Sequence, residues 1–275
     1  MPCPYPWNIA MSRKFQKGER VQFYRDGKWI KGKVTALVGP SRRLLTDAGH
    51  SEKVAVARLT KAKDSVLLLE TRLESSLTKP DRQYAELFSR ALRANLVEIR
   101  HERVHTKNDL RHFLQEANRA KDIRFIHIIG HGREADEKSA ARLCLTFEDV
   151  DLRKNANLFR GLPGRILIFS SCEIGRDRDA LLGILQKSGA QCIYAYNQEV
   201  DDWYSIIVEL LLYDRLINQP DWPPERVGRE VQKALNQLGL KPDESRRWGS
   251  KSTALVWFTQ RELKAEENHN GRERN

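Results

Sequence analysis

The chain has 275 residues, of which 40% are hydrophobic and 31% are charged, a balance typical of a soluble globular protein rather than a disordered one. No apolar run approaches the ~18 residues that cross a membrane, so the composition predicts neither a transmembrane protein nor a membrane partner. At roughly 150 residues per domain, a chain of this length accommodates one large domain or two smaller ones, and we expect two.

The positive charge is concentrated in the first quarter of the chain. Residues 1–63 hold fourteen Lys or Arg against four Asp or Glu, a net charge of +10 out of +11 for the whole chain. This asymmetry predicts an anionic partner, and both nucleic acid and an acidic protein surface are candidates. A basic domain without such a partner is an equally open interpretation.

The N-terminal residues 1–12 show prolines and no periodicity, which predicts a flexible segment. They lack the basic segment and apolar core of a secretory signal, so we expect a cytoplasmic protein. No CxxC unit is present, which predicts reduced thiols and neither a disulfide framework, a metal site nor a cofactor. The cysteines are Cys3, Cys144, Cys172 and Cys192.

Residues 13–63 show short strand-like runs joined by turns. Asp26-Gly27 lies between two such runs and predicts a tight hairpin. The pattern resembles a basic Tudor-like small β-barrel of the Src-homology-3 type, a fold that serves as a binding module. Tyr24 and Trp29 suit either a recognition groove or the small core, and for Trp29 we favour the core.

Residues 64–260 alternate strand-like and helix-like runs, the pattern of a mainly parallel sheet covered by helices on both faces. Thr106 is the expected N-cap of one helix, and Gly189 the expected end of another. Residues 143–147 predict a hairpin insertion, and residues 261–275 a charged tail that frays. The six expected strands are residues 66–69, 96–99, 123–129, 165–169, 192–196 and 254–258.

Two of these strand ends carry reactive side chains. The third strand is followed by Gly130-His131-Gly132, and the fourth by Ser171-Cys172. In open α/β sheets, ligands bind in the crevice outside the carboxyl ends of the strands, so residues that emerge there are candidates for chemistry. We therefore place an active site at these two strand ends.

These motifs resemble the caspase-like superfamily of cysteine peptidases, in which one strand ends in His-Gly and the next in a Cys-x-x-Gly segment. The CHAT branch is the most similar, and the resemblance covers roughly residues 64–260. It implies that Cys172 is the nucleophile and that His131 carries the proton, with the backbone N–H groups of Gly132 and Cys172 forming the oxyanion hole. In this superfamily a backbone carbonyl can orient the histidine, so no third side chain is required.

The resemblance also places the substrate pocket at the ends of the first and fifth strands. Carboxylates there suit a basic substrate side chain, although each is equally a solvated surface residue. The substrate-binding candidates are Glu70, Ser170, Glu199, Asp201 and Asp202. Ser170 departs from the acidic residue that metacaspases have two positions before the cysteine, which argues against a preference for Arg or Lys.

The remaining cysteines and histidines have structural interpretations. Cys144, Cys192 and His127 lie inside apolar runs and are expected to be core residues. His101 and His105 have a spacing found in metal sites, but no convincing Cys or acidic companion, so we expect no metal there.

The leading hypothesis is a cytoplasmic cysteine endopeptidase that cleaves a specific protein and depends on an activating protein or ligand. Relatives implied by the resemblance serve in bacterial defence and programmed-death circuits. The alternative, from a different class, is a nucleic-acid-binding or adaptor protein whose caspase-like domain is catalytically silent. Acyl transfer or amidase chemistry with the same thiol is a third possibility.

Overall fold

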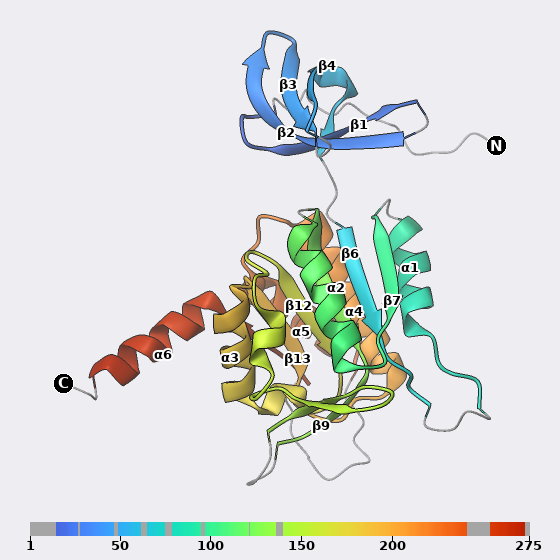
Figure 1. The fold of residues 1–275 in the computed structure, drawn as a ribbon, viewed down its shortest axis with the longest axis vertical. Coiled ribbons are helices and arrows are strands. Elements are labelled where there is room, and N and C mark those ends of the chain that lie inside the picture. Colours follow the sequence, from blue (N-terminus) through green and yellow to red (C-terminus); the bar gives the residue numbers. More distant parts are fainter. Residues whose placement is uncertain are drawn as a thin grey trace. The chain divides into compact units, whose positions relative to one another are not determined.

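The computed structural model describes residues 15–272, except residues 27, 47–48, 62–64, 75–78, 95–96, 121, 136–139 and 241–253. The predicted flexible segment, residues 1–12, lies outside this description. The chain divides into two compact units, Met1–Lys63 and Asp64–Asn275 (Figure 1). No helix in the described part of the chain is long and apolar enough to span a bilayer.

The first unit is an antiparallel half-barrel in the order β4-β3-β2-β1-β5. Its strands are β1 (Arg20–Arg25), β2 (Lys28–Val38), β3 (Ser41–Thr46), β4 (Ser51–Ala55) and β5 (Thr60–Lys61), with a 3₁₀ turn η1 (Val56–Arg58) before the last. The hairpin predicted from Asp26-Gly27 is confirmed, because Arg25 pairs with Lys28 and Asp26 has a φ of 50°. The side chains of Tyr24 and Trp29 lie outside the described part.

A small core fills the half-barrel. Side chains point alternately to the two faces of each strand, and those on the inner face form this core. The buried side chains are Phe15, Val21, Phe23, Val34, Leu44, Val54 and Leu59. Arg42 is also buried on this side, where its Nε donates to the carbonyl of Phe15 at 2.6 Å.

The second unit is built on a six-stranded, mostly parallel sheet flanked by helices, which confirms the predicted α/β class. The sheet order is β14-β13-β12-β8-β6-β7, with only β14 antiparallel to its neighbour. Its strands are β6 (Ser65–Glu70), β7 (Ile99–Arg103), β8 (Ile123–Ile129), β12 (Ile166–Ser170), β13 (Cys192–Tyr196) and β14 (Leu255–Thr259).

One strand differs in position from the prediction. The apolar residues 96–99 indicated the second strand, but β7 begins at Ile99 and continues through charged residues to Arg103. β7 is the edge of the sheet, so its side chains reach solvent and charge is tolerated there. Val97, two residues before β7, is buried at 3% exposure although it is not part of the strand.

Helices cover both faces of this sheet (Figure 1). Apolar residues of α2 and α3 share a core with one face, and those of α1, α4 and α5 with the other. The helices are α1 (Tyr84–Ala94), α2 (Lys107–Arg119), α3 (Arg178–Ser188), α4 (Asp202–Asn218), α5 (Pro224–Gln237) and α6 (Gln260–Arg272). Thr106 caps α2 and Gly189 ends α3, as predicted.

The charged residues 261–275 were expected to fray, but α6 includes most of them. Thr259 and Glu262 stabilise its start, because the Thr259 N–H donates to the Glu262 carboxylate at 2.9 Å. An ion pair of 3.5 Å joins Glu266 to Arg178 of α3.

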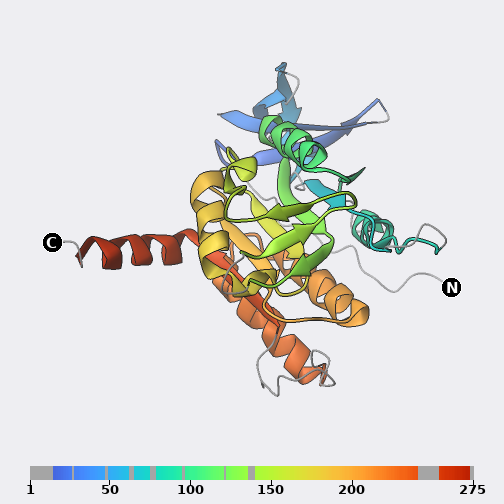
Figure 2. The same cartoon turned by 60° about the horizontal axis from the view of Figure 1, so that its bottom comes forward.

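A small antiparallel sheet adjoins the carboxyl ends of the strands, an edge that Figure 2 turns forward. It consists of β9 (His131–Arg133), β10 (Arg142–Cys144) and β11 (Asp149–Asp151). The predicted hairpin insertion is its β10–β11 pair, and β9 follows β8 after one residue. Two short 3₁₀ helices complete the unit, η2 (Ala156–Phe159) and η3 (Ile174–Arg176).

The strand order creates a switch point in the sheet. From β6 the chain moves outward to β7 and then returns to β8 on the other side of β6. The helices that follow β6 and β7 consequently lie on opposite faces, and a crevice opens where β6 and β8 meet. The segment after β6 therefore lies beside the residues that follow β8.

Candidate active site

The strands β6, β8 and β12 end level with one another at the carboxyl edge of the six-stranded sheet. Ile129 of β8 is in register with both Glu70 of β6 and Ser170 of β12. The ladder continues one step further, since the Gly130 N–H donates to the Ser170 carbonyl at 3.1 Å. His131 and Cys172, each two residues beyond its strand, are thus delivered from adjacent strands to the same edge.

His131 is held by a backbone carbonyl from the loop after β6. Its Nε2 lies 2.7 Å from the carbonyl oxygen of Leu73. A carbonyl oxygen can only accept a hydrogen bond, so Nε2 carries the hydrogen and Nδ1 of the neutral ring is the basic nitrogen. His131 as a residue is exposed. A proton exchange with a bound group would use Nδ1, since Nε2 is engaged by Leu73.

Gly132 lies directly against the peptide of Cys172. A Cβ at position 132 would come 2.1 Å from the Cys172 carbonyl oxygen and 3.1 Å from Cγ1 of Ile174. Only glycine allows this approach. Since Gly132 also pairs with Leu143 of β10, the three-stranded sheet holds this backbone in place.

Cys172 lies on a sharp turn between β12 and the 3₁₀ helix η3. Glu173 adopts a left-handed φ of 62°, which a residue with a side chain rarely adopts. A Cβ at Gly175 would come within 2.8 Å of the Tyr196 backbone of β13. The turn is thereby pressed onto the sheet, and Cys172 projects at its outer end, half-buried.

The thiol of Cys172 is protonated in this arrangement. Its Sγ donates to the carbonyl of Val200 at 3.7 Å. Burial raises the pKa of Cys172, and the nearby carboxylates Glu199, Glu173 and Asp202 raise it further, so that the net shift is upward although the contact with Val200 lowers it. At neutral pH Cys172 is therefore a thiol, and not the thiolate that attacks carbonyl carbons.

A small cavity of about 50 Å³ joins the two reactive side chains. His131, Ser170 and Cys172 contribute to its lining from the strand ends, Leu73 from the loop, and Asp202 from the first turn of α4. Pockets that hold drug-sized ligands have volumes of roughly 300–1,000 Å³. The cavity is therefore much smaller than a pocket that encloses a drug-sized ligand.

An ion pair closes one side of the cavity. Nη1 of Arg82 lies 2.7 Å from Asp202, and its Nε lies 3.0 Å from Glu74. Burial and the neighbouring Asp202 carboxylate raise the pKa of Tyr84, which also lines the cavity, to about 12. The expected acidic pocket thus contains an arginine of the chain itself.

The expected substrate-binding carboxylates differ in location. Asp202 lines the cavity, whereas Asp201 caps α4 by accepting from the Tyr204 N–H at 2.7 Å. Glu70 is fully buried, away from the cavity lining, and accepts from the Ala85 N–H at 2.9 Å. Glu199 is exposed and influences Cys172 through its charge.

The remaining candidates are structural. His127 and Cys192 are fully buried, as predicted. The ring of His127 lies 3.1 Å from Glu209 of α4 and 3.0 Å from the Tyr213 hydroxyl, which ties α4 to the sheet. Cys144 is half-buried, and burial raises its pKa to about 11. Within the described residues, no three His, Cys, Asp or Glu side chains cluster as metal ligands.

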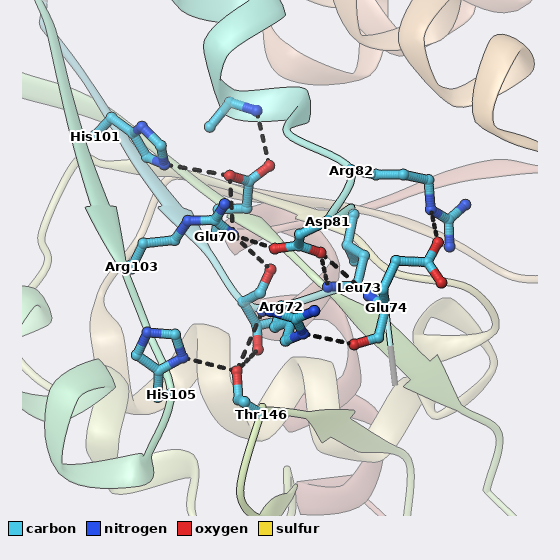
Figure 3. Close-up of polar contacts among 12 residues, drawn as sticks. Glu70, Arg72, Leu73, Glu74, Asp81, Arg82, His101, Arg103, His105 and Thr146 are labelled. Carbon is cyan, nitrogen blue, oxygen red and sulfur yellow. Dashed lines mark hydrogen bonds and ion pairs between the residues drawn. The ribbon is translucent and has the colours of Figure 1, made fainter. Parts of the chain in front are cut away.

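The loop after β6 contributes groups that the sequence did not single out. Figure 3 shows Asp81 and Arg103 around the backbone of Leu73, and Thr146 hydrogen-bonded to His105 at 2.8 Å. Only Asp81 lies in the loop itself, whereas Arg103 ends β7 and Thr146 follows β10. No sequence motif marked any of these three residues. A backbone carbonyl such as that of Leu73 leaves no signature in residue identity.

No protein-family model matches the chain, and neither does any curated protein sequence.

Proposed function

We propose that this protein is a cytoplasmic cysteine endopeptidase of the caspase-like, CHAT-type class that cleaves a specific protein substrate. The observation that carries the proposal is the delivery of His131 and Cys172 to one cavity from adjacent strands, with Nε2 of His131 already engaged by Leu73. This leaves Nδ1 as the proton carrier, and the thiol lines the same cavity. A cysteine–histidine dyad requires these two groups.

The proposed reaction proceeds through a thioester. Nδ1 of His131 takes the thiol proton, and Sγ of Cys172 bonds to the scissile carbonyl carbon while the carbonyl oxygen gains negative charge. Backbone N–H groups of Gly132 and Cys172 stabilise that oxyanion. The C–N bond then breaks, the leaving amine takes the proton from His131, and water hydrolyses the thioester to restore the thiol.

Activation by a protein or ligand is part of the proposal. The raised pKa of Cys172, its hydrogen bond to Val200 and the small cavity all describe a resting site. An activator that moves the start of α4 would break the contact with Val200 and widen the cavity. A wider cavity favours substrate entry. It also admits water to the thiol, which favours the thiolate because burial is the main cause of the raised pKa of Cys172.

The test is cleavage of a diverse peptide library, read by mass spectrometry, with wild type, Cys172→Ala and the matched control Cys144→Ser. Each is incubated alone and with RNA, DNA or a cell extract that supplies activators. Cleavage by wild type and Cys144→Ser, lost in Cys172→Ala, supports the proposal. Equal cleavage by Cys172→Ala, or none by any variant under every condition, overturns it.

A second candidate function, nucleic-acid binding, is favoured by one face of the half-barrel. Arg43 of β3 is directly opposite Lys53 of β4, and Lys33 of β2 is opposite Leu45. All four side chains are exposed on the same outward face. Like charges directly opposite one another destabilise a sheet, so folding does not account for this pair, whereas a phosphate backbone does.

This second function has its own experiment. We expect single-stranded or duplex nucleic acid to bind with an affinity that falls steeply with salt, and the slope to shrink in the variant Lys33→Glu/Arg43→Glu/Lys53→Glu. Salt-insensitive binding, or an unchanged slope in that variant, would count against it. If binding persists while peptide cleavage is absent, the adaptor hypothesis becomes the leading one.

A further inference from the structure

The carbonyl that engages His131 belongs to a peptide group whose other end is also occupied. The C=O of Leu73 and the N–H of Glu74 form one peptide unit and point in opposite directions. Nε2 of His131 donates to that C=O at 2.7 Å, and the N–H donates to Oδ1 of Asp81 at 3.2 Å. Asp81 and His131 therefore lie at opposite ends of a single peptide.

Asp81 is built into this position. The same Oδ1 also accepts the Leu73 N–H at 3.0 Å, and Oδ2 accepts from Nη1 of Arg103 at 3.0 Å (Figure 3). Its side chain is only 13% exposed. Burial raises the pKa of Asp81, but the N–H groups of Glu74 and Leu73 and the charge of Arg103 outweigh this, so that the pKa is lowered and the carboxylate is charged.

Arg103 anchors the carboxylate to the sheet. It projects from the edge strand β7, donates to the Thr71 carbonyl at 3.3 Å, and lies 3.4 Å from the buried Glu70. Glu70 in turn accepts from the N–H of Ala85 in the first turn of α1. The loop after β6 is thus fastened to β6, β7 and α1 through charged groups, with Asp81 as their contact to the Leu73 peptide.

We propose that Asp81 is a positioning residue that acts on His131 through the Leu73–Glu74 peptide, the role that a directly bonded carboxylate has in a catalytic triad. The negative charge polarises the peptide and strengthens its carbonyl as an acceptor, because hydrogen bonds in a chain reinforce one another. The carbonyl then keeps the hydrogen on Nε2 and stabilises the imidazolium that forms when the thiol proton moves. This inference rests on the proposed dyad.

Three variants separate charge, hydrogen bonding and general loop structure. Asp81→Asn keeps an oxygen that accepts from both N–H groups but removes the charge, and Asp81→Ala removes both. Asp109→Asn is the matched control, since Asp109 also accepts two backbone N–H groups, from His105 at 3.0 Å and Thr106 at 2.8 Å, without contacting the Leu73 peptide. Thermal unfolding first establishes that each variant is folded.

The first readout requires no substrate. ¹⁵N NMR of the His131 ring reports which nitrogen carries the hydrogen, and we expect the Nε2–H form in wild type and Asp109→Asn. Asp81→Ala should show a mixture of both tautomers, and Asp81→Asn an intermediate state. An unchanged ring signal in a folded Asp81→Ala protein would overturn the inference, whatever the outcome of the peptidase test.

The second readout is peptide cleavage by the activated enzyme. A misplaced catalytic group costs about 10²-fold, so we expect kcat to fall by about that factor in Asp81→Ala, with KM little changed. Asp81→Asn should fall between Asp81→Ala and wild type. A fall confined to KM, or an equal fall in Asp109→Asn, would make Asp81 a merely structural residue. If NMR shows the expected change and no variant cleaves, the positioning stands and the peptidase proposal fails.

Discussion

The two sides of the candidate site are held by different forces. Ser171, Ile174 and Gly175 around the cysteine are buried, so Cys172 is positioned by packing and by close backbone contact. His131 is exposed and oriented through the loop after β6, which polar and charged contacts hold in place.

This difference indicates which side of the candidate site can respond to pH, to charge or to a bound partner. Close packing has few alternative arrangements, so the position of Cys172 resists small perturbations. Hydrogen bonds and ion pairs at a partly exposed loop respond to pH, to charge and to a bound partner. We therefore expect changes on the cysteine side to affect folding, and changes on the histidine side to affect chemistry with little loss of stability.

The largest effect is expected on the packed side, for Gly132→Ala. The added Cβ meets the Cys172 carbonyl oxygen at 2.1 Å, so backbone must move. We expect a loss of about 3 kcal/mol in unfolding free energy, together with loss of peptide cleavage. Gly183→Ala in α3 is the matched control, because nothing lies within 4 Å of its Cβ. Equal stability of the two variants would show that close packing at Gly132 does not hold Cys172 in position.

Asp177→Ala should have the next largest effect. This buried carboxylate caps α3 by accepting from Ala180 N–H at 3.1 Å and also accepts from Ala141 N–H at 2.9 Å. We expect a loss of about 2 kcal/mol, measured by chemical denaturation. Asp179→Ala, whose side chain is 77% exposed, should change little.

The same residue predicts a pH dependence. Burial raises the pKa of Asp177, but Arg153 and the two N–H groups outweigh it and the net shift is downward. A carboxylate with a lowered folded-state pKa contributes stability above its unfolded pKa, near 3.9, and loses it as the pH falls through the folded value. This acid-dependent contribution should disappear in Asp177→Ala.

A smaller effect concerns the reactivity of Cys172. Because burial and neighbouring carboxylates raise its pKa above the ordinary value of 9.0, alkylation by iodoacetamide should be slower at pH 7 than for an exposed cysteine. The rate should keep rising above pH 9. Mass spectrometry of the tryptic peptide that contains Cys172 measures this, and rapid alkylation at pH 7 without an activator would contradict the resting state.

The smallest change in stability is expected for Arg82→Ala. This substitution breaks the ion pair between Arg82 in the loop after β6 and Asp202 in the first turn of α4. Both partners are partly exposed, so the unfolding free energy should change by less than about 1 kcal/mol. The freed Asp202 should then favour substrates with Lys or Arg before the cleaved bond, measured with the peptide library. Arg90→Ala, which removes an exposed ion pair within α1, is the matched control. Unchanged cleavage preferences would exclude Asp202 from substrate recognition.

Much of the fold was predictable because its signals are local. Apolar runs indicated the sheet strands, and Thr106 and Gly189 marked helix ends through their own capping preferences. The edge strand β7 was misplaced because solvent exposure removed its apolar pattern. The charged α6 was missed because its start depends on the contact between Thr259 and Glu262 rather than on an apolar face.

Strand periodicity and the residues at strand ends are local properties. They were enough to show that His131 and Cys172 follow consecutive apolar strands of the sheet in the α/β unit. The strand order was not predictable in this way, nor was the switch point that brings the loop after β6 to His131. Contacts between segments distant in sequence depend on how the sheet pairs. The Leu73 carbonyl, the carboxylate of Asp81 behind it, and the pairing of Arg82 with Asp202 therefore emerged only from the folded chain.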